Sequence, residues 1–269
     1  MNRSRLKNII IIILLLLNGF LLGSLLFREA AVRSARSRTA EQLIALFAED
    51  DMILYADAIS TDTPPSPLSF VRDLAREETA AVFFLGESSA KEGKQDGLHI
   101  TYSSEHGTAR FRSNGSFEIS GILSQSDAES VCRSFCRAFS YETPVFNLDE
   151  TGSGTAVASA VHNGLPVHNC TVTFVLEEGT VTSVSGTLLP SSGTAAQPTK
   201  ESLTAPAALI TFQQYRKERG ASASSISKTR LCYELQTSAV SLSLSPVWCI
   251  ETDIAEYYVN CSTGSVNAG

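Results

Sequence analysis

The chain has 269 residues, of which 43% are hydrophobic and 18% are charged, a composition typical of a folded globular protein and not of a disordered one. Its net charge of −7 is unevenly distributed, because residues 1–38 sum to +6 and leave −13 for residues 39–269. A region this acidic repels the phosphate backbone of nucleic acids, so we do not expect nucleic-acid binding.

The N-terminal segment predicts a membrane anchor. A basic tip at residues 1–8 precedes residues 9–27, which carry no charge and are mostly Ile, Leu and Phe. A helix of this length spans about 28 Å, close to the thickness of a bilayer core. The alternative is a cleaved signal peptide, whose apolar region is shorter and ends at small residues. Here Phe27 is followed by Arg28 and Glu29. We therefore predict an uncleaved transmembrane helix over 9–27.

Three residues inside this apolar segment are candidates for contact with a partner helix. Gly19 and Gly23 form a G-x-x-x-G motif, which allows two helices to approach closely. Asn18 can donate and accept hydrogen bonds across such an interface, and its amide is costly to leave facing lipid. The alternative is that the motif arises by chance, since glycine is common in membrane helices. We predict helix–helix interaction through Asn18, Gly19 and Gly23.

The next two segments differ in their predicted secondary structure. Helical spacing of apolar residues predicts a juxtamembrane helix over 28–62, which a proline-rich stretch ends. Residues 63–123 predict a first β-rich subdomain. Its strand-like segments are 80–86, 98–103, 108–112 and 116–120.

Residues 124–190 predict a helix followed by an antiparallel meander. Val131, Phe135 and Phe139 lie on one helical stripe, and three strand-like segments follow. The turns Asn163-Gly164 and Glu178-Gly179 are two-residue hairpin signals, because such turns need positive φ angles. The strands are expected near 155–162, 165–177 and 180–188.

Residues 200–269 repeat this order of elements, with a helix over 203–219 and strands near 230–236, 242–252 and 256–261. Trp248 lies in an apolar strand, beside the Tyr257-Tyr258 strand, and is predicted to be buried. The fold class expected is therefore α+β, with an N-terminal transmembrane helix followed by repeated helix-plus-antiparallel-meander units.

A search for catalytic chemistry finds none of the common motifs. The sequence contains no H-E-x-x-H, G-x-S-x-G, P-loop or G-x-G-x-x-G pattern. His162 and His168 flank a hairpin turn, but the turn places them about six residues apart along the ladder, too far to share a metal. A nucleophile pair of Cys170 with His168 stays open, although two residues on one strand face do not compose a site. We predict no enzyme, and no catalytic, cofactor-binding or metal-ligating residues.

The six cysteines do not define a disulfide scaffold in a chain of this length. No C-x-x-C occurs, so a zinc ribbon or a thioredoxin-type motif has no support. Cys132 and Cys136 share one face of a predicted helix and are expected to be small buried hydrophobes. The sequence leaves their disulfide state open.

Two stretches resemble a known family. Residues 162–174 with 178–186 read HNGLPVHNCTVTF and EGTVTSVSG, and residues 244–253 with 257–264 read LSPVWCIETD and YYVNCSTG. These stretches resemble hairpins of the YycI/YycH regulatory proteins and related PepSY-like modules. The N-terminus is similar as well, with a short basic run, an Ile/Leu span carrying Asn18, a long helix and a proline-rich break.

The resemblance implies a role in signal transduction in a Gram-positive organism. It implies a single-pass protein with a cytoplasmic N-terminus and an extracellular domain, built from PepSY-like units. It also implies two protein partners, a WalK-type sensor histidine kinase of a two-component system and a sister regulatory protein, and no catalytic residues. The alternative is a PepSY-type membrane-tethered inhibitor or chaperone of an exported peptidase. The residues indicate neither the stimulus nor the sign of regulation.

Overall fold

The computed structural model describes residues 3–87, 90–92, 99–123, 127–196, 202–220, 222–238 and 241–269. The helices are α1 (Arg3–Ala48), the 3-10 helix η1 (Ala56–Ala58), α2 (Leu74–Leu85), α3 (Ala128–Ala138) and α4 (Ala205–Arg219). The strands are β1 (Ile53–Leu54), β2 (Leu68–Phe70), β3 (Ala90–Glu92), β4 (His99–Ser104), β5 (Gly107–Arg112), β6 (Ser116–Gly121), β7 (Val145–Leu148), β8 (Gly154–His162), β9 (Leu165–Glu177), β10 (Thr180–Thr187), β11 (Thr194–Ala195), β12 (Ser225–Thr237), β13 (Leu242–Thr252), β14 (Glu256–Asn260) and β15 (Val266–Ala268).

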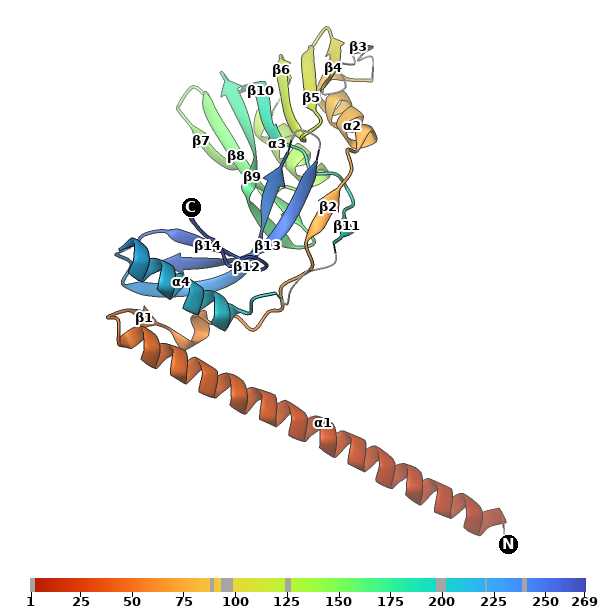
Figure 1. Cartoon of the computed structure of the whole chain (residues 1–269). Coiled ribbons are helices and arrows are strands. Elements are labelled where there is room, and N and C mark those ends of the chain that lie inside the picture. The colour runs from red at the N-terminus through yellow and green to blue at the C-terminus, as the bar shows by residue number, and fades with distance from the viewer. Residues whose placement is uncertain are drawn as a thin grey trace.

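These strands form one large mixed β-sheet (Figure 1). Its main path runs β11-β2-β13-β12-β9-β10-β6-β5-β4-β3, while β7 and β8 extend it beside β9, and β14 and β15 beside β13. Most neighbours are antiparallel, but β9 and β12 are parallel, as are β1 and β12. Helices α2 and α3 pack against the β4–β10 part of the sheet, and α4 packs against β13 and β14.

The predicted fold class, a transmembrane helix followed by repeated PepSY-like helix-plus-meander units, is wrong. The strands expected in separate units pair with each other, with Val167 of β9 opposite Tyr233 of β12. The Asn169 side chain reinforces this junction, because it donates to the Leu235 carbonyl at 2.8 Å and accepts from the Leu235 N–H at 2.7 Å. Pairing between residues 66 positions apart leaves no trace in local periodicity, which is why the sequence suggested separate units.

Helix α1 continues without a break through the boundary predicted between residues 27 and 28. It ends at Ala48 and not at residue 62, because Asp51 adopts a left-handed conformation with φ 55°. The chain then forms β1 and η1, and β1 adds a short parallel pair to β12, with Ile53 opposite Ser225. In Figure 1, α1 projects away from the sheet, and its C-terminal end lies beside α4.

The prediction of a transmembrane helix over 9–27 is contradicted. Among the residues that the structure describes, no helix is long and apolar enough to cross a membrane. The same finding contradicts the predicted single-pass membrane location, with a cytoplasmic N-terminus and an extracellular domain.

Packing fixes the C-terminal end of α1 to the rest of the molecule. Leu43 and Phe47 of α1 and Met52 after it are buried in a cluster with Leu209 and Phe212 of α4. This cluster also covers one face of β12, β13 and β14. Burying a side chain such as Phe47 contributes about 1.5–3 kcal/mol, so the cluster holds α1 in place.

Polar contacts at the end of α1 add to this attachment. The Asp50 carboxylate accepts hydrogen bonds from Gln213 Nε2 at 2.5 Å and Lys217 Nζ at 2.7 Å. The Asp50 carbonyl accepts from Arg216 Nη2 at 2.7 Å. The hydrogen bond from Lys217, followed by that from Gln213, lowers the pKa of Asp50. These hydrogen bonds and this ion pair connect the C-terminal part of α4 to the turn that follows α1.

The strand predicted over 80–86 is part of helix α2. Asp73 caps this helix, because its carboxylate accepts a hydrogen bond from the Arg76 N–H at 3.1 Å. Ala81 and Phe84 are buried at helical spacing. Val82, Phe83 and Phe84 have high β-propensity, and the packed face of the helix overrides it.

The two predicted hairpin turns are confirmed. Asn163 and Gly164 have φ angles of 50° and 80°, and Glu178 and Gly179 have φ angles of 48° and 74°. Two consecutive positive φ angles match the twist of the flanking strands β8–β9 and β9–β10.

The prediction that Trp248 is buried is confirmed, since its exposed fraction is 0%. Its indole Nε1–H donates to the Leu203 carbonyl at 2.7 Å, ahead of α4. Trp248→Ala should lower the free energy of unfolding by about 3–5 kcal/mol, as for a large aromatic removed from a core. Trp248→Phe keeps most of the apolar contact and leaves the Leu203 carbonyl without its donor, so it should cost about 1–3 kcal/mol.

Urea unfolding followed by far-UV circular dichroism measures both variants. A loss below about 1 kcal/mol for Trp248→Ala would mean that this side chain does not organise the C-terminal core.

Candidate functional site

The residues predicted to mediate helix contact lie on the projecting part of α1. Asn18 and Gly19 are exposed, and a Cβ built on Gly19 meets nothing within 4 Å. The surroundings of Gly23 fall outside the described residues. The apolar neighbours are exposed as well: Leu17 is 52% exposed and Phe20 is 73% exposed. No part of the chain that the structure describes covers Gly19, so its surface is open to a partner.

A second candidate site lies where β2 leads into α2. Several adjoining hollows open around residues 69–79 and the loop 188–194. One of them has a volume of about 190 Å³ and is lined by Arg76, Tyr141, His162 and Ser191 among others. Segments far apart in the sequence converge here, namely α2, the turn after α3, the end of β8 and the segment after β10.

Arg76 borders three of these hollows, and its guanidinium is their most unusual polar group. Its Nη2–H donates to the Phe139 carbonyl at 2.9 Å, and its guanidinium carbon lies 5.3 Å from the centre of the Phe139 ring. Its Nε is buried and has no hydrogen-bond partner among the described residues. Burial lowers the pKa of Arg76.

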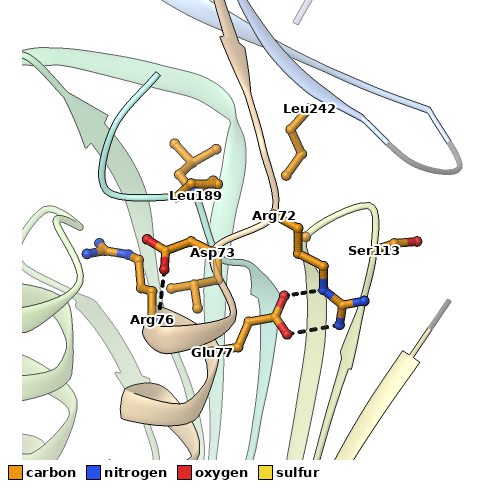
Figure 2. Close-up of a pocket in the computed structure, with 10 residues that line it drawn as sticks. Arg72, Asp73, Arg76, Glu77, Ser113, Leu189 and Leu242 are labelled. Atoms are coloured by element: carbon orange, nitrogen blue, oxygen red, sulfur yellow. Dashed lines mark hydrogen bonds and ion pairs between the residues drawn. The ribbon is translucent and has the colours of Figure 1, made fainter. Parts of the chain in front are cut away.

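The other charged groups at the start of α2 are already paired (Figure 2). Arg72 binds Glu77 with two parallel hydrogen bonds of 2.7 and 2.9 Å. The Asp73 carboxylate caps the helix and also accepts from the Ser191 hydroxyl at 2.5 Å, and this second bond is the main cause of its lowered pKa. Figure 2 shows the guanidinium of Arg76 pointing away from the Arg72–Glu77 pair.

His162 lines the same 190 Å³ hollow. Its ring makes edge contacts with Phe70 at 5.3 Å and with Tyr233 at 6.1 Å between ring centres. Burial lowers its pKa below the ordinary 6.5, and the positive charge of Arg76 lowers it further. Near neutral pH this imidazole is therefore uncharged, and it leaves Arg76 as the positive group of the hollow.

A third cluster of chemically active side chains lies on the face of β12–β14 opposite α4. Arg230 donates to Glu251 at 2.7 Å and to Glu256 at 3.0 Å. Its Nη1 lies 3.9 Å from the Cys232 sulfur. A hydrogen bond from the Cys249 thiol lowers the pKa of Cys232, and the same bond raises the pKa of Cys249.

Three groups of this cluster have the right chemistry to hold a metal. One ligand atom each from Cys249, Glu251 and Glu256 lie within 4.8 Å of one another. However, Arg230 already pairs with both carboxylates and supplies the positive charge there. A metal would have to displace this guanidinium, so we interpret the arrangement as a partly exposed ion-pair network.

The sequence predictions located only the first of these sites. His162 lines the hollow and His168 stacks on Tyr258 with ring centres 3.7 Å apart, so the two histidines belong to different surroundings. Arg76 was missed because α2 was not recognised as a helix. The available signal for the helix was Asp73 as a cap, followed by the acidic residue Glu77 in the first turn.

Comparisons with known proteins assign no family. No protein-family model and no curated protein matches the sequence. Among solved structures, an uncharacterized protein from Eubacterium rectale ATCC 33656 aligns with 81% of this chain and 85% of its own, with a TM-score of 0.44 and 11% sequence identity.

The electrostatic coupling between Arg76 and His162 can be measured. Arg76→Met should raise the pKa of His162, because it removes a positive charge that opposes protonation of the imidazole. The pKa should stay below the ordinary value of 6.5, because burial is the larger cause and is unchanged. NMR titration of the imidazole carbon-bound protons measures this shift, with His162→Gln to assign the signal. An unchanged pKa would show that Arg76 does not act on the hollow.

Proposed function

We propose that this chain is a non-enzymatic accessory protein that regulates a sensor histidine kinase of a two-component system through protein–protein contacts. The contact surface is the projecting stretch of α1 between Leu14 and Ser24. The proposal rests on two supports, the likeness of the sequence to YycI/YycH regulatory proteins and the exposed apolar side chains of this stretch.

The exposed stretch is the observation that carries the proposal. Leu14, Leu17, Phe20 and Leu22 are between 50% and 73% exposed. Leaving several large apolar side chains of one helical segment in water is unfavourable, and a group of this kind marks an interaction site. Leu14, Leu17 and Leu21 recur at helical spacing, which suits packing against another helix.

The attachment of α1 to the sheet makes this surface useful for regulation. Phe47 and Asp50 hold the other end of the same helix against α4. A continuous helix transmits a rotation or a shift along its length. A change in the orientation of the sheet and α4 would therefore move the surface that a partner binds near Phe20. A small polar residue, Asn18, and Gly19 lie in the middle of the stretch and would allow close approach of the partner helix.

Cross-linking in the cells that make the protein tests this proposal directly. Replacing Phe20 by the photoreactive amino acid benzoylphenylalanine should give an adduct with a sensor histidine kinase, identified by mass spectrometry. The matched control carries the same amino acid at Val145, which is 74% exposed against 73% for Phe20 and lies on edge strand β7. An adduct with a peptidase at position 20 would favour the alternative function, and equal adducts at both positions would mean that α1 is no specific surface.

The small and polar residues of α1 should decide whether the adduct forms. In the Phe20 cross-linking background, the triple change Asn18→Leu, Gly19→Leu and Gly23→Leu should abolish the kinase adduct, because bulky side chains separate two packed helices. Ser34→Leu with Ser37→Leu is the control, since both serines are exposed on the same helix outside the apolar stretch. Retention of the adduct in the triple variant would rule out close helix packing at these residues.

A further inference from the structure

Arg76 makes no direct ion pair within the described part of the chain, although the negative charge of Asp73 acts on it from a greater distance. Within the described part of the chain, no Asp or Glu oxygen lies within ion-pair distance of its guanidinium, and its buried Nε–H has no acceptor. Glu77 next to it is paired with Arg72, and Asp73 is occupied by the helix cap and Ser191. A half-buried charge in this condition costs free energy unless an acceptor reaches it.

The position of Arg76 in its helix adds to this cost. Arg76 lies in the first turn of α2, where the helix dipole is positive and disfavours a cation. The Asp73 carboxylate supplies the anion that this dipole favours, through its cap on the Arg76 N–H, but it makes no ion pair with the Arg76 guanidinium. Two unfavourable features at one residue are explained together if an anion occupies the adjoining hollow.

The walls of the hollow indicate the kind of anion. Phe139 and Tyr141 supply apolar and aromatic surface, while Ser140, Ser191 and His162 supply polar groups. Ser140 has a left-handed conformation with φ 62° because it follows the C-terminal end of helix α3, where the Tyr141 N–H donates to the Cys136 carbonyl at 2.8 Å, and this turn places Ser140 at the wall of the hollow.

We propose that this hollow binds a carboxylate group, which accepts hydrogen bonds from the guanidinium of Arg76. A planar carboxylate matches the fork of donors on an arginine. The volume of about 190 Å³ accommodates a carboxylate with a small attached group, and the ring of Phe139 packs against that group. The Asp73 carboxylate borders the neighbouring hollow and repels any anion, so it disfavours a dianionic phosphate about twice as strongly as a singly charged carboxylate.

Two sources could supply the carboxylate, a small free acid or the C-terminus of a peptide. The test is an NMR titration of the full-length, isotope-labelled chain with benzoate, benzamide, inorganic phosphate and the tripeptide Ala-Ala-Phe with a free or amidated C-terminus. Benzoate should give saturable shifts at the Arg76 side chain, Ser140 and Ser191, and benzamide should not. Phosphate should bind more weakly than benzoate. Tighter binding of the free tripeptide than of benzoate identifies a peptide C-terminus, and the reverse identifies a small acid.

Variants separate a specific site from general attraction to positive charge. Arg76→Met should weaken benzoate binding about tenfold or more, the loss expected when a charge-assisted hydrogen bond is removed. Arg76→Lys should retain part of the binding, because it keeps the charge and loses the planar fork. Arg133→Met is the matched control, since Arg133 also lies over a ring, 5.0 Å from Phe146, but is paired with Glu129 at 2.8 Å.

Three results would overturn the proposal. They are the absence of any saturable shift at Arg76 with the carboxylate probes, equal binding of benzamide and benzoate, and equal losses in Arg76→Met and Arg133→Met. The first two are measured on the unaltered chain, so they do not depend on the folding of a variant. The site lies on α2 and the sheet, so its failure leaves the proposal for α1 untouched.

Discussion

The burial of Phe47 between α4 and the C-terminal sheet places α1 relative to everything else in the molecule. Phe47 is 0% exposed, and Leu43 one turn earlier is 4% exposed. Beyond Leu43 toward the N-terminus, the described side chains of α1 find no partner of this kind and become exposed. One continuous helix thus has two environments, a docked end and a free apolar stretch. Without the docking contact, the free stretch would be a tether with no fixed direction.

The same C-terminal core shows what local sequence patterns can reveal. The apolar run around Trp248 predicts its burial. Residues that favour positive φ predict the turns at Asn163 and Glu178, and helical spacing of apolar residues predicts α4. No such local pattern predicts the pairing of β9 with β12, because Asn169 and Leu235 lie 66 residues apart in the sequence. The β-prone Val-Phe-Phe run predicts a strand, whereas the Asp73 cap and the buried face of Ala81 and Phe84 make this segment helix α2.

The candidate sites differ in how much of each can be predicted from the sequence. Asn18 and Gly19 stand next to each other in a recognisable pattern, so the sequence sufficed to select them. Arg76 becomes noteworthy only when the contacts of its neighbours are known, since Asp73, three residues earlier, would otherwise be its natural partner. Arg230 likewise stands 21 and 26 residues from the carboxylates that it binds. Charge balance is a property of the folded arrangement, and a linear sequence records only the charges.

The central claim is that one helix is docked at its C-terminal end and free in its apolar stretch. Native-state hydrogen exchange of the full-length chain, without partners, tests it most directly. The account predicts that the amides of Leu43 and Phe47 exchange as slowly as that of Trp248, through global unfolding, while those of Asn18 to Leu22 exchange orders of magnitude faster. Fast exchange at Phe47 would show that α1 is not docked, and slow exchange at Phe20 would show that the apolar stretch is already covered; either result would contradict the account.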